Sequence, residues 1–164
     1  MKVNNLTQSA VFITLTLIIL YFSSILPINT LSILTIASCL IPICVIKISL
    51  RNAILVYVSS TILSFLILPI KFSIYYGAFF GIYGIIKYLI EKLNSLFLEI
   101  ILKLISFNLL LTFSYLLIKA LLGLNNINIS LFTFIILAQF AFLIFDYALT
   151  LIISFYLNRI HKHV

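Results

Sequence analysis

The sequence predicts an all-α integral membrane protein: a polytopic bundle of six transmembrane helices that forms a single domain over residues 1–164. Three observations predict this fold class. Of the residues, 65% are hydrophobic and only 8% are charged, and the apolar residues lie in six long runs. Soluble domains keep roughly a quarter of their residues charged, so this chain could not cover its own surface with polar groups in water. The runs are apolar at nearly every position, which favours helices over the alternating strands of a membrane barrel.

Short polar or proline-containing breaks separate the six runs. We expect the spans at Leu6–Leu26, Leu31–Ile46, Ala53–Leu68, Phe72–Ile90, Leu96–Ile118 and Leu131–Leu157. Pro27 follows the first run and Pro69 follows the third, at positions where proline would not allow the helix to continue. The longer runs have the roughly 20 residues that a helix needs to cross a bilayer.

The basic residues are distributed unequally between the two sides of this bundle. Six spans place both chain ends on one side, together with Lys2, Lys47, Arg51, Lys87, Lys92, Lys103, Arg159 and Lys162. The opposite side keeps only Lys71 and Lys119. Because cytoplasmic loops carry the excess of Lys and Arg, we expect a cell-membrane protein with both termini in the cytoplasm. The net charge of +7 is scattered singly, which predicts contact with membrane lipid and no nucleic acid partner.

Asp146 lies near the middle of the last apolar run and is one of only three acidic residues in the chain. A carboxylate at that depth costs about 2.5–3.5 kcal/mol on insertion scales, so we expect it to face the bundle interior. Lys103, seven residues into the fifth run, lies at a depth that its long side chain can match. We therefore predict an intramembrane Lys103–Asp146 ion pair, with Glu99 competing for the lysine at a spacing of four. Fixing helix register, coupling or proton relay, and a simply protonated acid all remain open as roles.

Three of the four glycines, Gly77, Gly81 and Gly84, lie on one face of the fourth run. Glycines at this spacing let another helix backbone approach closely, and helix association in lipid depends on such contacts. Two interpretations follow: packing against another helix of the same chain, or docking of a partner membrane protein.

The outward half of the bundle offers a candidate site for a small planar or anionic solute. Its residues would be Asn29, Tyr75, Tyr76, Tyr115, Asn125 and Gln139. Aromatic rings with a few amides can hold such a molecule. The same residues have ordinary uses, because tyrosine favours the headgroup region and asparagine favours loops.

No catalytic constellation is present in the sequence. A phosphate-binding loop, a nucleophile elbow and a metalloprotease helix motif are all missing. Cys39 and Cys44 have no His or acidic residue at metal-ligand spacing. We therefore expect no enzyme activity, no catalytic residue, no cofactor and no metal site.

The layout of the whole chain resembles the substrate-binding (S) components of energy-coupling-factor (ECF) vitamin transporters. Segment Leu34–Leu68 also resembles the YybS-like membrane proteins, in which a proline-containing helix, a basic turn and a small-residue helix recur. S components carry an Ala-x-x-x-Ala-type face on the first helix, where a coupling subunit docks. The nearest match here is Ala10 with Thr14.

This resemblance implies a subunit that binds a vitamin-like solute and takes part in its uptake. It also implies a pocket on the outer side under the loop Pro27–Thr30, and a complex with a transmembrane coupling subunit and cytoplasmic ATPases. The competing hypothesis is a small membrane scaffold that assembles with other membrane proteins.

Overall fold

The computed structural model describes residues 3–26, 30–93, 95–122 and 131–159, and every element in these ranges is helical. The elements are α1 (Val3–Ile25), α2 (Thr30–Lys47), α3 (Leu50–Ile67), α4 (Ile70–Tyr75), the π-helical segment η2 (Tyr76–Phe80), α5 (Gly81–Glu91), α6 (Leu96–Leu122) and α7 (Leu131–Arg159). Segments α4, η2 and α5 follow one another without a break and form one rod. The all-α prediction is confirmed for the described residues.

Six of the described helices are long and apolar enough to cross a membrane, as the sequence predicted. Their spans are Val3–Ile25, Thr30–Lys47, Leu50–Ile67, Ile70–Glu91, Leu96–Leu117 and Ile136–Asn158. The main difference from the prediction lies at Lys119, which was expected in a loop but belongs to α6. The helix continues there because alanine and leucine, which follow this lysine, are good helix formers.

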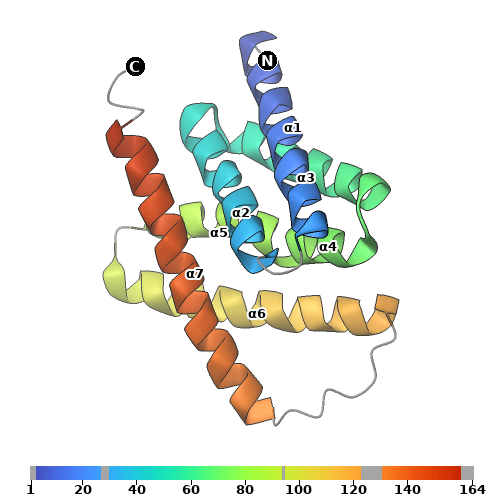
Figure 1. Cartoon of the computed structure of the whole chain (residues 1–164). Coiled ribbons are helices and arrows are strands. Elements are labelled where there is room, and N and C mark those ends of the chain that lie inside the picture. Colours follow the sequence, from blue (N-terminus) through green and yellow to red (C-terminus); the bar gives the residue numbers. More distant parts are fainter. Residues whose placement is uncertain (1–2, 27–29, 94, 123–130, 160–164) are drawn as a thin grey trace.

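Helix α2 lies at the centre of the molecule and packs against α1, α3, α5 and α7. In Figure 1 the α2–α3 connection and the end of α5 lie to the left, and the α3–α4 connection lies to the right. Successive helices therefore traverse the molecule in alternate directions. Helix α7 leans against α2 and crosses α6 instead of running alongside it.

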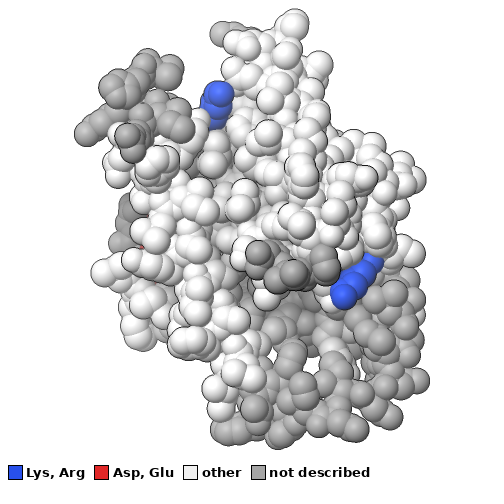
Figure 2. Space-filling view, in the orientation of Figure 1, with Lys and Arg blue, Asp and Glu red and all other residues white. Residues whose placement is uncertain are grey.

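The outer surface of the described chain is largely apolar. Figure 2 shows a face that is almost entirely uncharged, with basic side chains only at isolated places. Leu66 is 78% exposed and Phe97 is 74% exposed, and many other large apolar side chains share this outward position. An apolar exterior of this extent fits a lipid environment.

The glycine face of the fourth span is covered by the chain's own helices. A Cβ added at these glycines would lie 2.7 Å from Thr61 Cγ2 at Gly77, 2.8 Å from the Tyr57 ring at Gly81, and 2.9 Å from Pro42 Cδ at Gly84. The structure thus places α2 and α3 where the glycines allow close approach. A partner protein has no access to this face while both helices stay packed.

The π-helical segment η2 is held by hydroxyl groups from the neighbouring helices. The Tyr57 hydroxyl donates to the Gly77 carbonyl over 2.6 Å, and the Ser38 hydroxyl donates to the Phe80 carbonyl. A π-turn contains one residue more than an α-turn, so it rotates everything that follows by about 100°. This rotation determines the direction in which the side chains of α5 project.

Candidate functional site: a charge network between three helices

All three acidic residues of the chain meet two lysines between α5, α6 and α7. Asp146 on α7 is bound on both carboxylate oxygens. Lys87 Nζ from α5 lies 2.6 Å from Asp146 Oδ1, and Lys103 Nζ from α6 lies 3.1 Å from Oδ2. The structure therefore brings together the predicted pair Lys103 and Asp146, and it adds Lys87 as a second and closer partner.

The two glutamates complete the network. Glu91 Oε1 lies 2.7 Å from Lys87 Nζ and 2.9 Å from Lys103 Nζ, so this one oxygen bridges both lysines. Glu99 Oε1 lies 2.6 Å from Lys103 Nζ. Both ion pairs of Glu91 use Oε1, which leaves Glu91 Oε2 without a partner among the described residues.

Two neutral hydroxyl groups bind the same charges. The Tyr83 hydroxyl donates to Asp146 Oδ1 over 2.7 Å, and Lys87 Nζ donates to the Thr150 hydroxyl over 2.8 Å. Lys87 therefore uses its ammonium protons on Asp146, Glu91 and Thr150. Hydrogen bonds to every charged group are what make a buried ion cluster tolerable in an apolar bundle.

Helical spacing explains why each element contributes its residues. Tyr83, Lys87 and Glu91 follow one another at intervals of four on α5, so they share one face. Glu99 and Lys103 have the same spacing on α6. Asp146 and Thr150 have it on α7. Three helix faces that each carry charges four residues apart thus meet along one line.

The network is deeply buried and carries an excess of one negative charge. The side chain of Lys87 is 0% exposed and that of Asp146 is 17% exposed, whereas Glu91 is the most accessible member at 33%. With every group ionised, three carboxylates and two ammonium groups give a net charge of −1. An opposite charge or a proton would therefore be attracted to the cluster, and Glu91 is the member best placed to receive it.

Aromatic rings pack against the network on the side away from Glu91. The Tyr83 ring lies 5.4 Å from the Phe142 ring and 5.3 Å from the Phe145 ring, measured between centroids. The Phe107 and Phe142 rings stack at 4.3 Å between α6 and α7. These rings bury a large area and make edge-to-face contacts that favour one arrangement. They hold the three helices together next to the charges.

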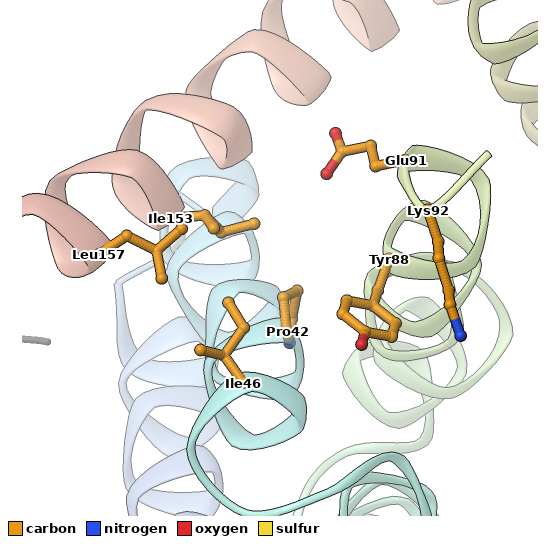
Figure 3. A pocket seen from close by; sticks show the side chains of 7 residues that line it. All are labelled: Pro42, Ile46, Tyr88, Glu91, Lys92, Ile153 and Leu157. Carbon is orange, nitrogen blue, oxygen red and sulfur yellow. The ribbon is translucent and has the colours of Figure 1, made fainter. Parts of the chain in front are cut away.

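A cavity of about 300 Å³ opens beside the network at the end where α2, α5 and α7 finish. It is lined by Pro42, Ile46, Tyr88, Glu91, Lys92, Ile153 and Leu157. Figure 3 shows the Glu91 side chain reaching toward the space below α7, while the Lys92 side chain runs away from it past Tyr88. Glu91 is thus the link between the buried charges and the cavity. A second, shallow depression is lined only by residues of α7 between Leu151 and Asn158.

The residues predicted for an outward solute site do not line either of these two cavities. Tyr76 is fully buried and its hydroxyl lies 3.0 Å from Ser60 Oγ. Tyr115 is 45% exposed, and Gln139 donates to Asn108 Oδ1 over 2.8 Å. The remaining placements are Tyr75, whose ring lies 5.9 Å from Lys71 Nζ, and Asn29 and Asn125, which fall outside the described residues.

The predicted docking pair on the first helix, Ala10 and Thr14, lies exposed on α1. The Thr14 hydroxyl donates to the Ala10 carbonyl over 2.9 Å, within its own helix. This pair therefore presents a small, smooth surface to the outside of the molecule, and no other described helix covers it.

Lys87 is the functional residue that sequence reasoning missed. It was counted only as a cation near the end of a span, although Glu91 four residues later was a visible signal for an ion pair. Its burial depends on the rotation that η2 introduces, and an apolar sequence gives no sign of a π-turn. Among the described residues no group of three His, Cys, Asp or Glu side chains is arranged to hold a metal ion.

Comparison with known proteins adds no relative: no family model, no curated protein and no solved structure matches this chain.

Proposed function

We propose that this protein is a membrane subunit that binds a small solute and takes part in its uptake, in the manner of an ECF S component, without an ATPase of its own. The observation that carries the proposal is the charge network beside a cavity, with Glu91 belonging to both. Ionisable side chains inside membrane spans are rare and costly, and in transport proteins they mark substrate or ion pathways. A purely structural ion cluster has no need of a cavity at its most accessible member.

The proposed orientation puts both chain ends in the cytoplasm of the cell. The cavity then lies at the cytoplasmic end of the bundle, because α5 and α7 both finish there. The proposed partners are a coupling transmembrane subunit on the exposed Ala10–Thr14 face of α1, and cytoplasmic ATPases that supply the energy. Close approach of small residues is the ordinary way in which membrane helices associate.

Purification of the full chain in mild detergent, followed by native mass spectrometry, tests the proposal. We expect a small molecule to remain bound to the wild type. Ile153→Trp, which fills the cavity, is expected to remove it. Ile136→Trp on the same helix is the matched control, since Ile136 is 52% exposed and lines no described cavity. A wild type that holds no small molecule, together with unchanged uptake in cells lacking the protein, would contradict a solute-binding role.

The second candidate function is a membrane scaffold, and one observation favours it. The spans of α6 and α7 each bury only 17% of their residues within the molecule, so both offer long apolar faces. In the same purification, a stoichiometric protein partner without any bound small molecule would favour the scaffold. The glycine face cannot serve as its contact surface, because α2 and α3 already occupy it.

A further inference from the structure

The cavity beside the network combines three features that one class of ligand would use together. Glu91 contributes a carboxylate whose Oε2 has no partner among the described residues. Tyr88 contributes an aromatic ring, and Pro42, Ile153 and Leu157 contribute aliphatic walls. In Figure 3 these side chains surround one space, with the Glu91 carboxylate at one edge and the Tyr88 ring at another.

The charge balance determines the sign of the ligand. The network carries a net charge of −1 when all its groups are ionised, and Glu91 is its only member in the cavity wall. Lys92 is the only other charged residue of the wall, and Figure 3 shows its side chain directed away from the Glu91 carboxylate. An anion would meet the free oxygen of Glu91 and be repelled, whereas a cation would be attracted.

We propose that this cavity binds a small organic cation, an ammonium group on an apolar body. The ammonium would donate to Glu91 Oε2 and lie near the face of the Tyr88 ring, which attracts cations. The apolar body would lie against Pro42, Ile153 and Leu157. The volume of about 300 Å³ is at the lower end of ligand pockets, which favours a compact amine over a large one.

This ligand class refines the proposed uptake function and rests on it for the transport step, although not for binding itself. The same chemistry is offered by a soluble amine and by the ethanolamine headgroup of a lipid. Both would place an ammonium at Glu91 and an apolar chain along the aliphatic wall. The experiment must therefore separate the two sources.

Equilibrium binding of radiolabelled 2-phenylethylammonium to the full-length protein in neutral detergent tests the proposal. The neutral isostere 2-phenylethanol serves as competitor control. We expect saturable binding that the alcohol does not displace. Glu91→Gln should weaken binding by about tenfold or more, as expected for loss of a charge-assisted contact. Equal displacement by amine and alcohol, or unchanged affinity of Glu91→Gln, would overturn the assignment.

Two further variants separate contact in the cavity from the overall charge of the network. Glu99→Gln removes the same charge, but Glu99 does not line the cavity, so binding should weaken clearly less than in Glu91→Gln. Ile153→Trp leaves every ion pair in place and should abolish binding by filling the space. It also provides the test if Glu91→Gln does not fold. Equal losses in both glutamine variants, or retained binding in Ile153→Trp, would place the amine elsewhere.

Lipid analysis of the same preparation identifies the source of the ammonium. An ethanolamine lipid that co-purifies with the wild type, is displaced by phenylethylammonium and is absent from Ile153→Trp would identify a lipid occupant. Amine binding without such a lipid would identify a soluble one. Binding in detergent combined with no uptake of the labelled amine into cells would support the ligand class and refute the transport function. Uptake of another solute without amine binding would do the reverse.

Discussion

Replacing Lys87 with methionine removes the most deeply buried charge of the network while keeping a side chain of similar length. The ammonium group has contacts at 2.6 Å to Asp146, 2.7 Å to Glu91 and 2.8 Å to Thr150, and its side chain is 0% exposed. Without it, three carboxylates share one lysine and the net charge changes from −1 to −2. Breaking a buried ion pair in this way costs about 3–5 kcal/mol, because the remaining charges stay buried without compensation.

Asp146→Asn is the matched comparison, and the charge count predicts a much smaller effect. It leaves two glutamates and two lysines, so the net charge becomes zero and each lysine keeps a carboxylate partner. The expected cost is about 1–2 kcal/mol, the value of weakened hydrogen bonds. The double variant Lys87→Met with Asp146→Asn returns to −1 and should be more stable than Lys87→Met alone.

Unfolding by SDS in mixed micelles, followed by circular dichroism, measures these differences. The order of stability should be wild type, then Asp146→Asn, then the double variant, then Lys87→Met. If Asp146→Asn were less stable than Lys87→Met, or if the double variant were the least stable of all, the charge count would not govern the stability of the bundle. Wild-type stability of Lys87→Met would refute the network itself.

Three further outcomes are expected in the same unfolding assay. Gly84→Ala should cost about 1–3 kcal/mol, because its Cβ would lie 2.9 Å from Pro42 Cδ; an unchanged midpoint would mean that α2 does not pack there. Tyr76→Phe should cost about 1 kcal/mol through loss of its hydrogen bond to a serine on α3, and a stabilised variant would refute that bond. Exchanging Lys103 and Asp146 should not restore the stability lost in the single variants, since a lysine at position 146 would face the other network lysine; full rescue would show that the pair acts alone.

The number and class of the helices could be predicted because the bilayer imposes them. Long apolar runs interrupted by proline and charge leave few alternatives to spanning helices. The inward position of Asp146 followed from its cost in lipid, and the reach of Lys103 followed from helical rise. Each of these inferences depends on residue type and spacing alone.

The rest depended on geometry that spacing does not contain. The π-turn at Tyr76–Phe80 sets the direction in which Lys87 projects, and nothing in its apolar sequence distinguishes it from an α-turn. The cavity arises where Pro42 on α2 faces Ile153 on α7, 111 positions apart in the chain. Contacts between such distant segments cannot be derived from the period of either helix. The predicted outward site failed to assemble for the same reason: Tyr76 turned inward to a serine, and Tyr115 remained exposed.

Magic-angle-spinning NMR of the protein in lipid bilayers tests the charge network most directly. With lysine ammonium nitrogens labelled with ¹⁵N and aspartate carboxyl carbons with ¹³C, the single aspartate of the chain, Asp146, gives one carboxyl signal. Contacts of 2.6 Å from Lys87 and 3.1 Å from Lys103 predict strong dipolar transfer from that carbon to two lysine nitrogens, each lost in the corresponding Lys→Met variant. Transfer to neither lysine in the wild type would contradict the network.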